Sequence, residues 1–230
     1  MQEHQPPPEV RGPERKPRGL PPNAMLEQVE ATHERLYHLM GEPLLVRTDD
    51  PLLLEVAEEA FSRFPAPNTG PQTPPLVIEL FVHDLRAQAP AVSKAERRQP
   101  VYRTHGHLYY VSEGSENTAV VDLLGGYAFG FVSRSMVHDR SSLRFTFLEG
   151  VGLAMLGPAR RFIPLHAACV VKEGVSVTLL GRAGSGKSTL AFACVRRGYR
   201  LLAEDGLMIK CRPDGLQLWG MPWKLHLLPD

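Results

Sequence analysis

The stretch GRAGSGKST, residues 181–189, most constrains how this 230-residue chain can fold. Its glycines, lysine and serine follow the spacing G-x-x-x-x-G-K-[ST]. An apolar, β-branched run (residues 175–180) precedes it, and a helical pattern (residues 189–197) that ends before Gly198 follows it. This motif forms a phosphate-binding loop when it lies between a strand and a helix. The sequence therefore predicts a buried strand, a loop and a helix within an α/β fold.

Each residue type in the loop suits the wrapping of a polyphosphate. Glycine lets backbone N–H groups come close to the anion, and the following helix presents unpaired N–H groups and the positive end of its dipole. Lys187 can reach the β- and γ-phosphates, and the Ser188 hydroxyl can ligate Mg²⁺. A glycine-rich turn, or a loop that has lost its activity, would carry the same letters. We expect a nucleotide to contact Gly181, Arg182, Ala183, Gly184, Ser185, Gly186, Lys187, Ser188 and Thr189.

An acidic pair and a histidine flank the loop in sequence. Glu204 and Asp205 follow the short apolar run LLA, one helix after the loop. At the carboxyl end of a strand, an acid can hold Mg²⁺ or take a proton from an attacking hydroxyl, but Asp-Gly is also a common turn pair. His166, within LHAACVV, can share a proton near the phosphate or be an ordinary core histidine. The residues alone leave these alternatives open.

Three stretches, LHAACVV, GRAGSGKSTLA and RRGYRLLAEDG, resemble the C-terminal kinase domain of the HPr kinase/phosphorylase family. Members carry a histidine on the strand before the phosphate loop, a GxxxxGKS loop and an acidic pair after it. The resemblance covers residues 160–230. It implies a P-loop core with a PEP-carboxykinase-like fold that transfers the γ-phosphate of ATP to a hydroxyl, often a serine. It further implies catalytic roles for Asp205, His166 and Lys187, and Mg²⁺ ligands among Ser188, Asp205 and Glu204.

Part of the family pattern has no counterpart here. The family has a further acidic metal ligand and a catalytic-loop arginine downstream, whereas WGMPWKLHLLPD offers Lys224, His226 and Asp230. The chain is thus expected to be a truncated relative or to be completed from elsewhere. No HPr kinase N-terminal domain is recognisable before residue 160, and nothing supports phosphorylase activity. A nucleotide-binding module without phosphoryl transfer, and a plain P-loop ATPase, remain as alternatives to a kinase.

Composition divides the rest of the chain. Residues 1–24, dense in proline and charge, predict a disordered leader, with Met25 as an alternative start. Residues 25–150 predict a mixed helix-and-strand region, and residues 151–230 the P-loop region. The boundary between the last two is soft, since the earlier strands can extend the same sheet.

Local patterns predict the elements of the middle region. Residues 25–40 have apolar positions near helical spacing, and a second helix begins at Pro51 with Asp49 or Asp50 as its cap. A short helix is predicted over residues 150–157. Strands are predicted over five short apolar runs, at residues 76–82, 107–111, 118–124, 127–133 and 143–149.

The bulk composition disfavours several classes of protein. A formal net charge of +1 provides no strong field for nucleic acid or an anionic membrane, and no apolar run approaches the roughly 18 residues that span a bilayer. The separated thiols of Cys169, Cys194 and Cys211 fit a reducing compartment, and no signal-peptide core is present. We expect a cytoplasmic protein with ATP, Mg²⁺ and a hydroxyl acceptor, either a protein serine or a small molecule, as partners; a homo-oligomer stays open.

Overall fold

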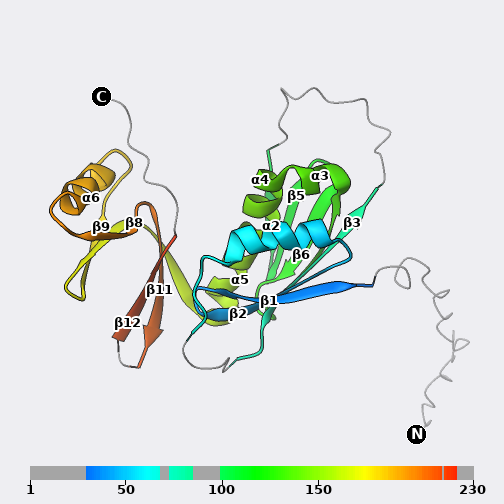
Figure 1. Ribbon diagram of the computed structural model, residues 1–230, viewed down its shortest axis with the longest axis horizontal. Helices are drawn as coiled ribbons and strands as arrows, with labels where there is room; N and C mark the ends of the chain where they lie inside the picture. Colours follow the sequence, from blue (N-terminus) through cyan, green and yellow to red (C-terminus); the bar gives the residue numbers. More distant parts are fainter. Residues whose placement is uncertain (1–29, 68–72, 85–98, 214, 222–230) are drawn as a thin grey trace, which may run out of the picture. The chain divides into compact units, whose positions relative to one another are not determined.

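The computed structural model describes residues 30–67, 73–84, 99–213 and 215–221. The chain from Ala31 onward forms one compact unit, in which two β-sheets combine with helices as an α/β structure (Figure 1). The predicted leader, residues 1–24, lies outside the described residues. None of the helices in the described ranges has the length and apolar character needed to cross a membrane.

The first sheet has seven strands in the order β1-β2-β3-β7-β6-β5-β4. β3 runs parallel to both β2 and β7, and the other neighbours are antiparallel. Four of the five predicted strand runs are confirmed as β3, β5, β6 and β7. The strands are β1 (His33–Leu39), β2 (Glu42–Thr48), β3 (Leu76–His83), β4 (Val101–His105), β5 (Leu108–Glu113), β6 (Asn117–Asp122) and β7 (Tyr127–Ser133).

The helix predicted over residues 25–40 is wrong where the structure describes it, because β1 occupies residues 33–39. Met40 and Gly41 join β1 to β2 with φ values of 53° and 80°, which fits a two-residue hairpin turn of type I′. Tyr37 and Leu39 alternate into the core, while Leu36 remains half exposed. Pairing with β2 therefore overrides the incomplete helical spacing.

Helix α2 (Pro51–Phe61) confirms the second helix prediction. Asp50 is its N-cap, and the Asp50 side chain accepts a hydrogen bond from the Leu52 N–H at 2.8 Å. Its apolar face packs on β1 and β2. The apolar residues of that face are buried: Leu53, Val56, Ala57, Ala60, Phe61 and, just beyond the helix, Phe64.

Residues 143–149 form a π-helix, so the strand predicted there is wrong. Ser133 and Asp139 cap two short helices whose run continues through these residues, and this local helical context decides the outcome. Thr146 is buried and Phe145 is 48% exposed, the reverse of what alternation along an amphipathic strand would give for this sequence. The run comprises α3 (Arg134–His138), α4 (Arg140–Ser142), η1 (Leu143–Glu149) and α5 (Gly150–Arg160), the last confirming the predicted short helix.

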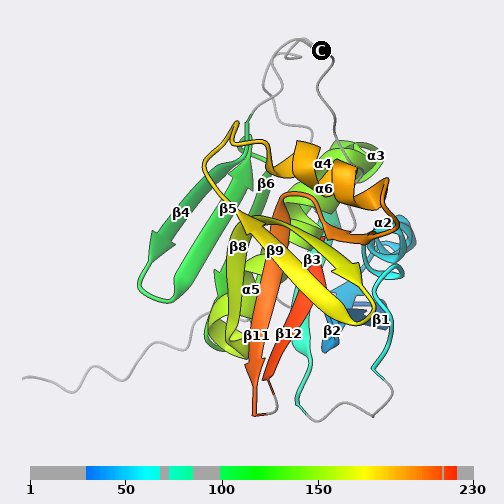
Figure 2. The ribbon, with the colours of Figure 1, turned by 90° about the vertical axis from the view of Figure 1, so that its left-hand side faces the viewer.

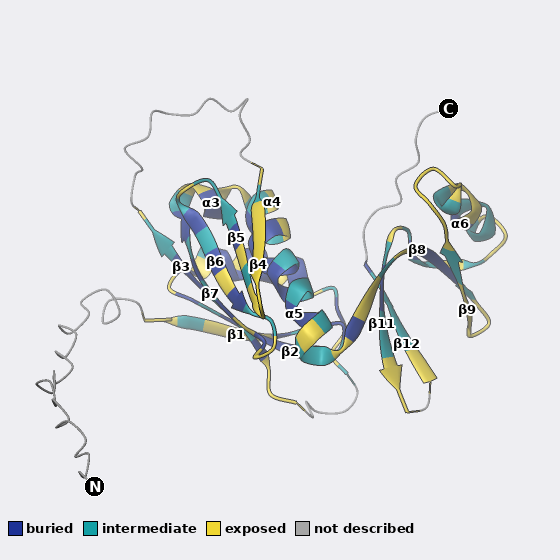
Figure 3. Cartoon of the chain, turned by 180° about the vertical axis from the view of Figure 1, so that it is seen from behind, coloured by how far each residue is buried: buried dark blue, intermediate teal, exposed yellow. Residues whose placement is uncertain are grey.

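The second sheet is built around the long strand β8, as Figure 2 shows. The residues predicted as a buried strand do form β9, but β9 is not buried: Val175 and Leu180 are 66% and 67% exposed. In the described part of the chain β9 pairs with β8 alone, and Figure 3 shows it without the dark blue of buried residues. The elements are β8 (Phe162–Lys172), β9 (Val175–Leu180), α6 (Lys187–Val195), β10 (Arg200–Ala203), β11 (Gly206–Arg212) and β12 (Gly215–Gly220).

A buried ion cluster ties the second sheet to β2. The Glu42 carboxylate contacts the ammonium of Lys210 on β11 and, at 3.3 Å, the guanidinium of Arg160 on α5. The three side chains are only 6%, 15% and 14% exposed, respectively. Phe162 and Met208 belong to the same hydrophobic cluster as the core of the first sheet. Charge pairing and apolar packing therefore both join the two sheets.

Replacing Glu42 with alanine should lower the free energy of unfolding by about 3–5 kcal/mol, because two poorly solvated cations would lose their shared partner. Urea denaturation at 25 °C measures this change. Glu34→Ala is the matched control: Glu34 pairs with Arg47 but is 62% exposed, so its loss should cost no more than about 1 kcal/mol. Equal losses for the two variants would contradict a structural role for the Glu42 cluster.

Candidate functional site

Strand β8 brings the predicted site residues to one place. Ala167 pairs with Leu180, the last residue before the glycine-rich loop, and the Ala167 N–H donates to the carbonyl of Asp205 at 3.0 Å. Because neighbouring strands lie about 4.8 Å apart, the start of the loop and the acidic pair flank β8 at a separation of roughly 10 Å. The loop, His166 and the acids thus meet around a single position of β8.

The glycine-rich loop joins β9 to α6 through backbone conformations that favour glycine. Gly184 and Gly186 have φ values of 76° and 84°, in the left-handed region, and Gly186 is the N-cap of α6. A Cβ on Gly181 would lie 2.5 Å from the Ser185 hydroxyl oxygen. The loop is therefore a tight turn whose helix begins at Lys187.

The Lys187 side chain folds back onto the glycine-rich loop, which precedes it in the sequence. Its ammonium donates to the backbone carbonyls of Gly181 and Arg182 at 3.0 Å and 3.2 Å. These bonds hold a positive charge across the start of the loop. An anion seated there would exchange two neutral acceptors for a charged one, which makes a stronger hydrogen bond.

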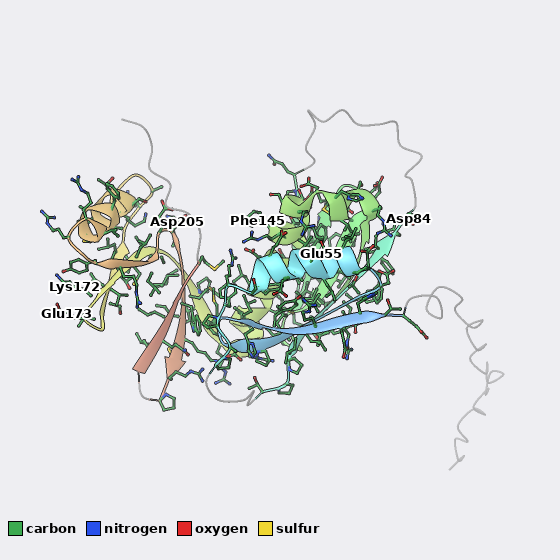
Figure 4. The ribbon with its side chains drawn as sticks, viewed as in Figure 1. Glu55, Asp84, Phe145, Lys172, Glu173 and Asp205 are labelled. Atoms are coloured by element: carbon green, nitrogen blue, oxygen red, sulfur yellow. The ribbon has the colours of Figure 1, made fainter. Side chains whose placement is uncertain are left out.

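His166 and Asp205 form a pair in direct contact. The Nδ1 atom of His166 lies 2.8 Å from Oδ1 of Asp205, and the two side chains are 56% and 53% exposed. Figure 4 shows Asp205 at the bend between β10 and β11. Because a carboxylate accepts hydrogen bonds, the neutral imidazole carries its proton on Nδ1, which leaves the lone pair on Nε2. Both groups are open to solvent and thus to a substrate.

The expected metal ligands are oxygen donors of the kind that Mg²⁺ prefers. Ser188 is in the first turn of α6 and half-buried, and Glu204 is half-buried beside Asp205. Among the described residues, no group of three histidine, cysteine or carboxylate side chains is placed to hold a metal ion. The Mg²⁺ ligands stay a prediction. Lys224, His226 and Asp230 lie outside the described residues.

The remaining loop residues expected to contact nucleotide, Arg182, Ala183 and Thr189, are exposed. A contributor that the sequence did not indicate is Ala167, which holds Asp205 through its backbone N–H. No side-chain pattern could have identified this residue. Glu204 and Asp205 lie in the chain between β10 and β11, and both of these strands pair with β8. The two acidic residues therefore lie alongside β8.

Comparisons with known proteins find partial similarity to HPr kinase/phosphorylases. The chain is 39% identical over 66 residues to the protein of that name from Streptococcus thermophilus (strain ATCC BAA-491 / LMD-9), which is 28% of this chain and 21% of that protein. Against that of Caldanaerobacter subterraneus subsp. tengcongensis it is 45% identical over 56 residues, or 24% and 18% of the two chains. The matched part thus spans about a fifth of these curated relatives. No protein-family model matches the chain, and no solved structure matches it significantly.

The contact between His166 and Asp205 predicts the tautomer of the histidine. In ¹⁵N-detected spectra of the neutral imidazole, His166 should carry its proton on Nδ1, and Asp205→Ala should shift the proton to Nε2 because the acceptor is removed. Signals of His105 and His107, in the first sheet and its β4–β5 turn, serve as internal controls and should not change. An Nε2–H tautomer in the wild type would contradict the contact.

Proposed function

We propose that this chain is a P-loop kinase with a PEP-carboxykinase-like core, which transfers the γ-phosphate of ATP to a hydroxyl acceptor. The observation that supports this proposal most directly is that the glycine-rich loop, His166 and Asp205 lie close together around Ala167 of β8. The partial similarity to HPr kinase/phosphorylases supports the same class of reaction. The acceptor can be a small molecule or a protein serine.

The loop would bind the triphosphate. Its backbone N–H groups and the N-terminal end of α6 would face the anion. Lys187 would turn from the carbonyls of Gly181 and Arg182 to the β- and γ-phosphates. Mg²⁺, when bound with the nucleotide, would neutralise phosphate charge. Ser188 and Glu204 are the residues proposed to hold it in the kinase, where Asp205 serves as the base.

Asp205 would act as the general base. As the acceptor oxygen bonds to the γ-phosphorus, the bond from that phosphorus to the β,γ-bridging oxygen breaks, and its electron pair leaves with ADP. The hydroxyl proton passes to Asp205. Because Oδ1 of Asp205 already contacts Nδ1 of His166, the proton would go to Oδ2 while His166 orients the carboxylate.

Two other functions use the same residues. In a P-loop ATPase Asp205 would hold the metal and water would be the nucleophile, so phosphate would be released without an acceptor. In a nucleotide-binding module no phosphate would move at all. The side chains of Asp205 and His166 are more than half exposed beside the loop, so an acceptor molecule can reach them. This exposure favours transfer to an acceptor over simple nucleotide binding.

Isothermal titration with Mg²⁺ and a non-hydrolysable ATP analogue tests the nucleotide site. Lys187→Ala should weaken binding about ten- to a hundredfold, because a charged hydrogen bond to phosphate contributes about 1.5–3 kcal/mol. Lys172→Ala is the matched control: Lys172 is exposed, lies over the Tyr199 ring and occupies the far end of the β8–β9 ladder, so binding should stay within twofold. Absence of binding by the wild type would refute the proposal.

Asp205→Asn tests the role of the base. With a hydroxyl acceptor that the wild type phosphorylates, this variant should transfer phosphate about 10²–10⁴-fold more slowly while the affinity for the nucleotide without Mg²⁺ stays unchanged. Phosphate release measured without any acceptor separates the kinase from the ATPase. Acceptor-independent release by the wild type at the full rate would favour the ATPase.

A further inference from the structure

A cavity of about 710 Å³ lies between helix α5 and the strands β8 and β11. Cavities of this size accommodate drug-sized ligands. The eleven described residues that line it are glycine, alanine, proline, leucine and methionine, so none brings a charged or hydrogen-bonding side chain. These eleven residues therefore suit an apolar body, and none of them provides a partner for an ionised group.

Small residues open the cavity on its helical side. Gly150, Ala154 and Gly157 follow one another at helical spacing along α5 and all line the space. The strand side is formed by Pro164 and Leu165 of β8 and by neighbouring positions of β11. Larger side chains at Ala154 and Gly157 would take up space between the helix and the strands.

The lining of the cavity includes the chain neighbours of His166 and Asp205. Leu165 directly precedes His166, and Gly206 directly follows Asp205. Gly206 also pairs with His166 across the β8–β11 ladder, and directly paired residues share one face of a sheet. A molecule bound against Gly206 would therefore lie on the same face of the sheet as His166, which contacts Asp205.

We propose that this cavity binds the apolar body of the phosphoryl acceptor and presents its hydroxyl to Asp205. The inference rests on the proposed kinase function and narrows its acceptor to a small, uncharged alcohol with an apolar skeleton. The protein would then select acceptors by the apolar surface area that binding removes from water, and the hydroxyl would be the polar group that reacts. Charged acceptors are disfavoured because none of the described lining side chains would compensate the lost hydration.

A series of linear alcohols from 1-propanol to 1-octanol tests the acceptor class. With MgATP, kcat/KM should rise about fourfold for each added methylene, as expected from the burial of each CH₂ group in an apolar site. A flat series would overturn the inference. Equal or faster transfer to free serine, which is charged, would overturn it as well.

Two variants of α5 link this selectivity to the cavity. Ala154→Phe should fill the space and reduce the preference for 1-octanol over 1-propanol at least tenfold, whereas Ala31→Phe, at an exposed position, should not change it. Gly157→Ala is a second, milder variant that tests the cavity in case Ala154→Phe does not fold. Its Cβ would lie 3.6 Å from the Phe162 carbonyl oxygen, an ordinary contact, and alanine suits a helix better than glycine. It should narrow the cavity and lower the preference in a folded protein.

Binding of 1-octanol by calorimetry separates failure of this inference from failure of the proposed function. The wild type and Lys187→Ala should bind 1-octanol equally, and Ala154→Phe should not bind it. If the wild type binds the nucleotide but not 1-octanol, the cavity inference is wrong and the kinase proposal stands. If it binds both but transfers phosphate to no alcohol in the series, the acceptor assignment is overturned.

Discussion

The pairing of β8 on both of its edges is the constraint on which the rest of the site depends. One edge holds β9, which leads into the glycine-rich loop, and the other holds β10 and β11, which carry the acidic pair between them. Side chains alternate along a strand, so a one-residue slip between β8 and β11 would turn His166 away from Asp205. The Glu42 cluster and the shared core with Phe162 and Met208 oppose such a slip, because Lys210 of β11 must reach Glu42.

Features set by neighbouring residues could be predicted from the sequence, and features set by distant pairing could not. Asp50 and Pro51 start α2 through a local cap, and the apolar run of β3 is β-branched and short. Residues 33–39 and 143–149 carry patterns compatible with either helix or strand. Pairing with β2 makes residues 33–39 a strand, and the capped helices before η1 make residues 143–149 helical. The predicted burial of β9 is wrong for a related reason. An apolar run indicates that a strand is able to be buried, but it does not indicate whether another element packs against that strand.

The site shows the same division. The loop conformation follows from glycines at fixed spacing, and the motif together with the patterns on either side of it indicated its place between a strand and a helix. The contact between His166 and Asp205 depends on the β8–β11 register, which joins residues about forty positions apart in the chain. Composition gave no sign of the cavity either, because its lining is made of ordinary apolar residues from a helix, two strands and Met221 after β12.

The π-helix η1 has a consequence for how such a cavity could arise. Its last turn directs the Gly150 N–H to the carbonyl of Phe145, five residues earlier, and a Cβ on Gly150 would come within 2.8 Å of that oxygen. One residue advances an α-helix by about 100°, so a chain shorter by one residue here would rotate α5 and turn Ala154 and Gly157 away from the strands. The space between α5 and the strands thus depends on the length of this helical run as well as on its side chains, so an insertion or deletion before Gly150 would alter it just as a substitution at Ala154 would.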